Sequence, residues 1–306
     1  MTDVLFIVNP AAGGGGTGRH WRTLESHLRG AGLRFESELT SRPGHGTELA
    51  RQAVKAGWPI VAAVGGDGTI SEVANGFFED GAPIPTRSRL AALTTGTGGD
   101  FRRTFGIPSA PEEVAAMLIA GRSRRIDAGR VTFALPSGGT AIRYFVNIVD
   151  AGIGGEVLTR INGGFRLING EITFAAAAGL ALLRWRNRPM RVTTDGSVHD
   201  VIAQQVVVAN CQYFAGGMRV APTALPDDGL LDVVVVGDMG LVDNLRGMGL
   251  IRRGAHLNHP KILHLHSRRV EISSPTPIHL DVDGELPGML PALIEAVPGA
   301  LELVCP

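Results

Sequence analysis

Hydrophobic and polar residues alternate along the first part of the chain in a way that is typical of a parallel α/β sheet. Short apolar runs predict strands at Val4–Val8, Phe35–Leu39, Ile60–Val64 and Leu90–Leu93. Apolar residues at helical spacing predict helices at Arg19–Arg29, Thr47–Ala56 and Glu112–Ile119. The alternation of strands and helices predicts a doubly wound α/β domain over residues 1–128.

After Asp127 the pattern changes to β-branched runs that are broken by Gly, Pro and Asp. These runs predict strands at Arg143–Val149, Met190–Thr194, Val201–Ala209, Leu231–Val236, Val270–Ser273 and Ile278–Val282. Helical insertions are predicted at Ile168–Arg184 and Leu241–Leu250. This spacing favours a mainly antiparallel β-sandwich domain over residues 129–289. The apolar tail, from about residue 290 to 306, is expected to return to the first domain.

The composition narrows the class of protein. The 306 residues carry 29 basic and 29 acidic side chains, so the chain lacks the broad basic field that nucleic acid requires. The only lysines, Lys55 and Lys261, do not stand in a Gly-Lys-Ser/Thr context, which argues against a P-loop NTPase. The two cysteines, Cys211 and Cys305, are far apart, so we expect neither a disulfide framework nor a zinc cluster.

No segment reads as a signal peptide or as a bilayer span. The most apolar helical stretch, Ile172–Leu183, is shorter than the ~20 residues that a spanning helix needs, and it ends in Arg184-Trp185-Arg186. These arginines suit either an anionic lipid surface or a solvated face. We therefore expect a cytoplasmic protein whose contact with a membrane is peripheral.

The strongest chemical motif is Gly65-Gly66-Asp67-Gly68-Thr69, between a predicted buried strand and a predicted helix. Glycines let backbone N–H groups approach phosphate closely, and the helix N-terminus adds partial positive charge. A carboxylate in an anion site is expected to accompany Mg²⁺ or to take a proton. The alternative is a tight strand-to-helix turn with Asp67 near the N-cap.

Two further glycine-rich loops follow predicted strands, at Asn9–Gly16 and at Thr94–Phe101. In an open α/β sheet the ligand lies outside the carboxyl ends of the strands. The three loops are therefore expected to converge on one pocket, although a glycine run alone is also a common flexible connector.

Five motifs follow one another along the chain. They are Asn9-Pro10 followed by glycines, Gly65–Thr69, Gly96–Phe101, Asp227–Asp232 and Asp283-Gly284-Glu285. In this order, along nearly the whole chain, they resemble the diacylglycerol kinase catalytic-domain family, which includes bacterial lipid kinases and is related to sphingosine kinases. The Gly-Gly-Asp-Gly-Thr element is shared with NAD kinases, whereas the last two motifs point to the lipid-kinase branch.

The resemblance implies roles for particular residues. The ATP-binding positions would be Asn9, Pro10, Gly13, Gly14, Thr40, Gly65, Gly66, Asp67, Gly68, Thr69, Ser71, Gly96 and Thr97. Asp67, Asp100 and Asp127 would form a carboxylate network around a catalytic Mg²⁺. A structural Mg²⁺ would be held by the carbonyl groups of Leu225 and Leu230 and by the Asp228 side chain. Asp283 or Glu285 would accept the proton of the substrate hydroxyl.

One position departs from the family pattern: Gly99 stands where the third loop usually has Asn. Since Gly tolerates the left-handed backbone that Asn often adopts, the shape of the loop is expected to survive without the amide side chain.

The sequence thus predicts an ATP- and Mg²⁺-dependent kinase that phosphorylates a hydroxyl group of a lipid, such as diacylglycerol, at the membrane surface. The lipid is expected to enter between the two domains. The alternatives are a kinase of another lipid, of a sphingoid base or of a soluble acceptor such as NAD, or a nucleotide-binding regulator without activity. An exposed edge strand would allow a homodimer, but the sequence identifies none.

His264 and His266 stand at strand spacing with no third ligand beside them, which favours an exposed strand over a metal site.

Overall fold

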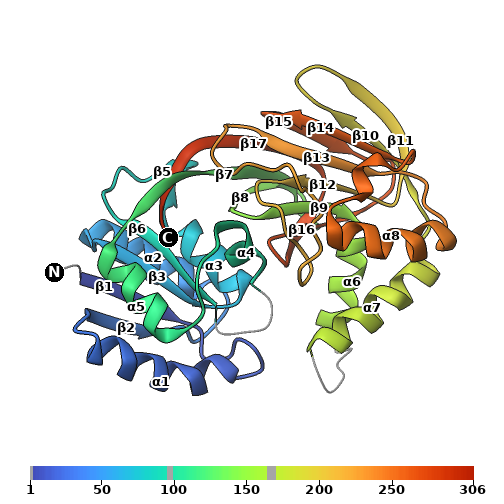
Figure 1. Cartoon of the computed structure of the whole chain (residues 1–306). Coiled ribbons are helices and arrows are strands. Elements are labelled where there is room, and N and C mark those ends of the chain that lie inside the picture. The colour runs from blue at the N-terminus through green and yellow to red at the C-terminus, as the bar shows by residue number, and fades with distance from the viewer. Residues whose placement is uncertain (1–2, 95–98, 164–169) are drawn as a thin grey trace. The chain divides into compact units, whose positions relative to one another are not determined.

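The computed structural model describes residues 3–94, 99–163 and 170–306 (Figure 1). The chain forms two compact units. Unit 1 comprises residues 1–128 together with residues 298–306, and unit 2 comprises residues 129–297.

Unit 1 is built on a parallel sheet. Its strands lie in the order β2 (Arg34–Leu39), β1 (Asp3–Val8), β3 (Ile60–Gly65) and β6 (Arg89–Thr94). The end of the long strand β17 (Glu285–Val304) joins this sheet, where Leu303 pairs in parallel with Leu90. Strand β3 is buried along its whole length, as expected for a central strand that is covered on both faces. Residues 298–306 of the predicted apolar tail therefore belong to unit 1, whereas residues 290–297, which were expected there as well, belong to unit 2.

The helices of unit 1 cover both faces of this sheet (Figure 1). They are α1 (Gly16–Gly30), α2 (His45–Ala56), α3 (Asp67–Asn75), α4 (Asp100–Phe105) and α5 (Pro111–Ala120), and a short hairpin of β4 (Phe78–Glu79) and β5 (Ala82–Pro83) follows α3. The chain moves one way from β1 to β2 and the other way from β2 to β3, so right-handed crossovers place α1 and α2 on opposite faces. Helix α1 contacts α5, and α2 contacts α3. This is the predicted doubly wound architecture.

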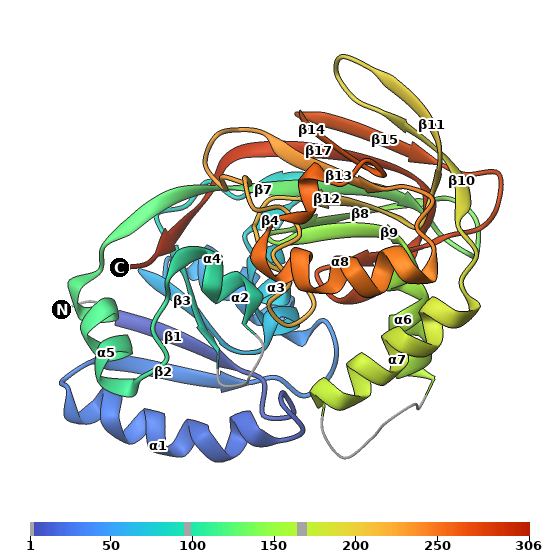
Figure 2. The same cartoon turned by 45° about the vertical axis from the view of Figure 1, so that its right-hand side comes forward.

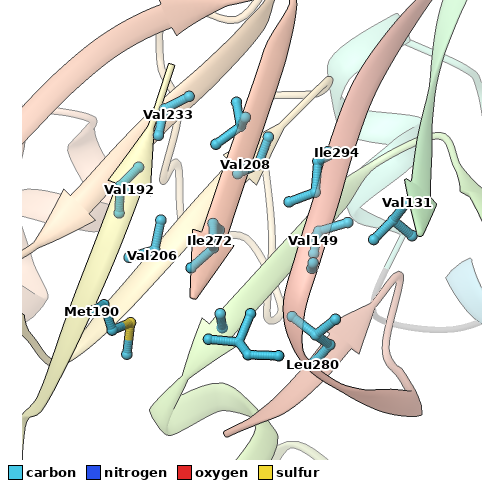
Figure 3. Close-up of a cluster of buried hydrophobic side chains, with 14 of the residues drawn as sticks. Val131, Val149, Met190, Val192, Val206, Val208, Val233, Ile272, Leu280 and Ile294 are labelled. Carbon is cyan, nitrogen blue, oxygen red and sulfur yellow. The ribbon is translucent and has the colours of Figure 1, made fainter. Parts of the chain in front are cut away.

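Unit 2 is an antiparallel β-sandwich, also as predicted. One row of strands is β14 (Ile262–Ser267), β13 (Leu231–Val236), β12 (Gln205–Ala209), β9 (Ile148–Gly152), β16 (His279–Val282) and the start of β17. The other row is β8 (Thr140–Phe145), β7 (Ser123–Ala134), the later part of β17, β15 (Arg269–Ser273), β10 (Arg188–Thr193) and β11 (Val198–Ala203). Apolar side chains of both rows meet in one buried cluster, part of which is drawn in Figure 3. Burial of this cluster is the main source of stability for a sandwich.

Two predicted strands prove to be pairs of strands. The predicted run Arg143–Val149 divides into β8 and β9, and the run Val201–Ala209 divides at Gln204 into β11 and β12. In both places the chain passes from one row of the sandwich to the other, since β8 pairs with β7 whereas β9 pairs with β12 and β16. A continuous apolar run shows burial, but it does not show a change of partner.

Three longer helices and one short turn complete unit 2 (Figure 2). They are α6 (Ile153–Asn162), α7 (Gly170–Arg184), α8 (Leu241–Arg253) and the 3₁₀ turn His256–Asn258. Val157 of α6 packs with Ala177 and Ala181 of α7. Helix α8 has no buried residue, and Ile251 is its partly buried contact with the sandwich. Within the described residues, no helix is long and apolar enough to cross a membrane.

Candidate functional site

The candidate site of unit 1 lies at the carboxyl ends of its parallel strands. Asn9 follows β1, Thr40 follows β2 and Gly66 follows β3. The backbone N–H of Asn9 donates to the Val64 carbonyl at 2.9 Å, and that of Thr40 donates to the Val8 carbonyl at 2.9 Å. The ladder therefore continues one residue beyond the strands and brings the beginnings of the loops of Asn9, Thr40 and Gly66 to one edge. Two of these, at Asn9 and Gly66, belong to the three glycine-rich loops that were expected to converge, and residues 95–98 of the third lie outside the described residues.

A side-chain hydrogen bond connects the loop that follows β1 to the glycine motif that follows β3. Asn9 Nδ2 donates to Thr69 Oγ1 at 3.1 Å, while its Oδ1 accepts the Ala11 N–H at 3.1 Å. The loop then turns through Gly13 and Gly14, which are exposed and have φ angles of +60° and +64°. A side chain at either position would be strained, so glycine is required here by the backbone itself.

The glycines of the Gly65–Thr69 motif differ in what they do. A Cβ on Gly65 would overlap the side chain of Thr69, so Gly65 allows the turn to close. A Cβ on Gly66 or Gly68 would meet nothing within 4 Å, and neither residue has a positive φ. The folded chain alone does not require glycine at these two positions. They leave open space at the first turn of α3. The Thr69 N–H already donates to the Gly66 carbonyl at 3.0 Å, whereas the N–H groups before it come too early in the helix for an intrahelical acceptor, and this arrangement suits a phosphate.

Asp67 connects the second glycine motif to the third. Its carboxylate accepts the backbone N–H groups of Gly99, Asp100 and Phe101, each at 3.2 Å. These donors lie at the start of α4, so Asp67 fixes the point where the third loop ends. Gly99 has a φ of +81°, which agrees with the expectation that a left-handed residue is needed there. The other predicted binding residues of this loop, Gly96 and Thr97, lie outside the described residues.

Glu72 is a positioning residue that the sequence reasoning did not single out. Its two carboxylate oxygens accept the N–H groups of Gly44 and Gly46, each at 2.9 Å, and the Thr47 hydroxyl donates to its carbonyl at 2.8 Å. Glu72 on α3 therefore holds the start of α2, next to the loop that contains Thr40. No local pattern marks this role, because the partners are more than 20 residues away.

Three further predicted residues of unit 1, Ser71, Asp100 and Asp127, are buried, whereas Pro10 is half-buried. Asp100 is ion-paired with Arg103 at 2.9 Å, and Asp127 accepts the N–H of Gly299 at 2.7 Å. The Ser71 side chain is fully buried, and its hydroxyl has no hydrogen-bond partner in the part of the chain that is described. The structure thus joins Asp67 to the backbone of Asp100, whereas Asp127 is anchored to the C-terminal segment.

The two predicted proton acceptors of unit 2 have different surroundings. Asp283 is buried, and its carboxylate accepts the N–H groups of Val146, Asn147 and Ile148 at 2.9, 3.1 and 2.9 Å. Its oxygens are therefore engaged in holding the crossing between β8 and β9. Glu285 has a side chain that is 40% exposed and forms an ion pair with Arg143 at 2.8 Å. Of the two carboxylates, Glu285 is the one that solvent can reach.

A second acidic pair of unit 2 was missed from the sequence. Asp150 of β9 and Asp281 of β16 stand opposite each other in the strand register, and both are buried. Burial raises the pKa of Asp281 to about 7. The N–H of Gly284, which donates to this carboxylate at 2.7 Å, has the smaller, opposite effect on the pKa. Burial raises the pKa of Asp150 well above its usual value, and the charge of Asp281 adds to this shift. Their burial and pairing became visible only when β9 and β16 were placed side by side.

The predicted Mg²⁺ loop of unit 2 lies between Ala224 and β13. The Asp228 carboxylate is exposed and accepts the N–H of Leu230 at 2.9 Å, while Leu225 is also exposed. Carboxylate and carbonyl oxygens are suitable ligands for Mg²⁺, which keeps several waters of its own. The residues present therefore fit such an ion.

Comparisons with known proteins agree with this architecture. The diacylglycerol kinase catalytic domain matches residues 3–131, and the YegS C-terminal NAD kinase beta sandwich-like domain matches residues 147–305. A diacylglycerol kinase of Staphylococcus aureus (strain bovine RF122 / ET3-1) is 29% identical over 287 residues, which cover 94% of this chain and 87% of that protein.

Solved structures show the same fold. A diacylglycerol kinase from Bacillus anthracis str. Sterne aligns with a TM-score of 0.72 and 24% identity, over 99% of this chain and 97% of that one. Yeast NADH kinase complexed with NADH aligns with a TM-score of 0.54 and 12% identity, over 100% and 84%. Since the two matched domains follow each other over most of the sequence, the chain belongs to the diacylglycerol kinase family of phosphotransferases.

Proposed function

We propose that the protein is an ATP- and Mg²⁺-dependent kinase that transfers the γ-phosphoryl group of ATP to a hydroxyl group of a lipid, with diacylglycerol as the first candidate. The observation that carries this proposal is the open space in front of Gly66 and Gly68 at the N-terminus of α3. Glycines that the fold does not need, at a helix N-terminus beside two other loops, are explained by a phosphate that approaches the backbone. The family relationship supports the same reaction.

In this proposal unit 1 binds and orients the nucleotide. N–H groups of the first turn of α3 donate to phosphate oxygens, and the exposed Gly13–Gly14 turn covers the phosphates from the first loop. Asp67 accepts three backbone N–H groups at the start of α4, but it is only half-buried, so its carboxylate, with that of Asp100, would still provide oxygens for the metal ion. Bound Mg²⁺ supplies neutralisation of the charge that develops on the transferred phosphoryl group. Such a site works mainly by positioning and charge stabilisation.

Unit 2 provides the proton acceptor. We assign this role to Glu285, because Asp283 is occupied by three backbone donors whereas Glu285 is exposed and is oriented by Arg143. The guanidinium group of Arg143 limits the rotamers of Glu285, as a base that must meet a hydroxyl requires. A Glu285→Gln variant is expected to bind nucleotide normally and to lose turnover, whereas Asp283→Asn is expected to lose stability first.

The surface of helix α8 supports a lipid acceptor. Leu241, Leu245 and Met248 recur along one side of this helix and are exposed, Leu245 to 66%. Arg252 and Arg253 form its last turn. Apolar side chains next to arginines suit the interface of an anionic membrane, where the former enter the acyl boundary and the latter meet phosphate headgroups.

The test of the reaction is transfer of labelled γ-phosphate from ATP to a panel of acceptors in mixed micelles. The panel contains diacylglycerol, monoacylglycerol, phosphatidylglycerol, sphingosine and ceramide, with NAD as the soluble acceptor. Labelling of one lipid by the wild type but not by Asp67→Asn is the expected result. The matched control is Asp80→Asn in the same unit, because Asp80 is exposed and its φ of +50° is tolerated by Asn.

The same experiment separates the alternatives. Labelling of NAD alone would replace the lipid by a soluble acceptor, and ATP binding without any labelled product would favour a regulator. Membrane contact is tested independently by sedimentation with vesicles that contain phosphatidylglycerol. Leu245→Glu is expected to reduce binding, whereas Ile119→Glu, at an exposed position of unit 1, is expected to leave it unchanged.

A further inference from the structure

Three side chains of unit 2 converge away from the residues of the proposed reaction: Asp232 on β13, and His264 and His266 on β14. The two strands are antiparallel neighbours, with Asp232 directly opposite His266 and with His264 two residues before it on the same face. His264 Nε2 lies 2.8 Å and His266 Nε2 lies 3.5 Å from the same oxygen, Asp232 Oδ1. The expectation that no third ligand accompanies the histidines was therefore wrong, because strand pairing supplies it.

The surroundings of this cluster resemble a built site. Asp232 is 3% exposed, His264 is 17% exposed, and His266, at 45%, leaves one side open to solvent. The Thr223 hydroxyl donates to Asp232 Oδ1 at 2.6 Å and thereby fixes the carboxylate from the loop before β13. Two imidazole nitrogens and one hydroxyl thus point at a single carboxylate oxygen, which has only two lone pairs to offer. A cation between these ligands would relieve that competition.

We propose that Asp232, His264 and His266 form a binding site for one divalent transition-metal ion of the zinc type. Two imidazole nitrogens and one carboxylate oxygen are a three-ligand set that zinc accepts, with water in the remaining position on the open side. Ligands in a tetrahedron at about 2.1 Å from the ion stand about 3.4 Å apart. The ligand atoms here lie within 4.8 Å of one another, so small side-chain rotations complete the geometry. Mg²⁺ prefers oxygen ligands only and is disfavoured by the two imidazoles.

The position of the site indicates what the ion would do. Strand β14 is the last strand of its row, and the ion would connect it to β13 by bonds that hydrogen bonding alone does not provide. Through Asp232 and Thr223 it would also steady the loop that contains Asp228. The proposed ion is distinct from the Mg²⁺ that the family resemblance assigns to that loop, because the donor atoms are different. The proposal does not depend on the reaction of unit 1.

The test is zinc binding to the untagged full-length protein by calorimetry, in excess Mg²⁺ so that oxygen-only sites are filled, at a pH where the imidazoles are neutral. Wild type is expected to bind one zinc ion per chain and, with Co²⁺, to show the visible absorption bands of a four-coordinate site. His266→Gln should weaken binding by at least about 100-fold, more than the 10–100-fold that loss of an outer hydrogen-bond partner causes. Thr223→Val, which removes such a partner, should fall within that smaller range.

His20→Gln on the exposed surface of α1 is the matched control and should bind zinc as the wild type does. His266 is partly exposed, so its replacement by Gln is expected to leave the fold intact, which circular dichroism verifies. As a second readout, zinc should raise the Tm of the wild type and not that of His266→Gln. Equal zinc affinity in wild type and His266→Gln, or no stoichiometric binding by the wild type, would overturn the proposal.

Discussion

Replacement of Asp281 by Asn is expected to stabilise the protein above neutral pH and to have little effect in acid. Asp281 is 4% exposed, and burial raises its pKa to about 7. In the unfolded chain an Asp titrates near 3.9. Between these two values the folded protein binds a proton that the unfolded chain has released, so stability falls as the pH rises through this range. Above about pH 7 the folded state contains a buried carboxylate, and Asn removes that charge.

The size of the effect follows from the shift. A difference of about three pKa units, at 1.36 kcal/mol per unit, corresponds to about 4 kcal/mol when the group is fully ionised. Since the neighbouring Asp150 titrates with Asp281, the two share protons, and we expect a measured change of about 2–4 kcal/mol. Asn retains an oxygen that can accept the Gly284 N–H, and its amide group can donate towards Asp150, which lies opposite it in the strand register.

The measurement is urea unfolding of wild type and Asp281→Asn at several pH values from about 3 to 8.5, a range that includes the titration of Asp in the unfolded chain. The advantage of the variant in the free energy of unfolding should be small at the acidic end and should grow towards the alkaline end. Asp195→Asn is the control of opposite sign, because the N–H of Arg268 lowers the pKa of this carboxylate. This second variant should lose stability at neutral pH, and its deficit should shrink as the pH falls. A pH-independent difference for Asp281→Asn would refute the reasoning.

Three further substitutions test the site. Gly68→Ala should keep or slightly raise the Tm, since Ala is favoured over Gly by up to about 1 kcal/mol within a helix. The same variant should bind nucleotide more weakly in calorimetry, and an unchanged affinity would contradict the phosphate assignment. Gly65→Ala, by contrast, should lower the Tm because its Cβ overlaps Thr69, and a wild-type Tm would show that the turn adapts. Asp283→Ala should lower the free energy of unfolding in urea by about 3 kcal/mol or more, because three buried N–H groups lose their acceptor. A loss below about 1 kcal/mol would show that water replaces the carboxylate.

Much of the fold is encoded in local patterns. Strands β1, β3 and β6 of unit 1 are short apolar runs between helical repeats, which the sequence shows without tertiary information. The glycine motifs after β1 and β3 are equally local, and parallel strands must bring their carboxyl ends to one edge. The shared edge of the glycine-rich loops that begin at Asn9 and Gly66 was therefore predictable before any contact was known.

Tertiary structure decided which carboxylates of those motifs are occupied by backbone N–H groups and which are exposed to solvent. The local sequence does not distinguish Asp283 from Glu285 as a candidate proton acceptor. The backbone N–H groups that occupy the Asp283 carboxylate come from more than 130 residues away. The position of Glu72 beside Gly44 and Gly46 likewise depends on the packing of α3 against α2.

The same reason explains the two clusters that the sequence did not reveal. Asp150 and Asp281, and Asp232 with His264 and His266, are each joined across neighbouring strands that are distant in sequence. A strand's alternation shows which of its side chains share a face, but the residue opposite is set by register and partner strand. Sequence alone therefore determined the family, most of the strands and the place of the glycine-rich loops. Only the three-dimensional pairing decided which carboxylates are buried, which are exposed and which lie beside imidazoles.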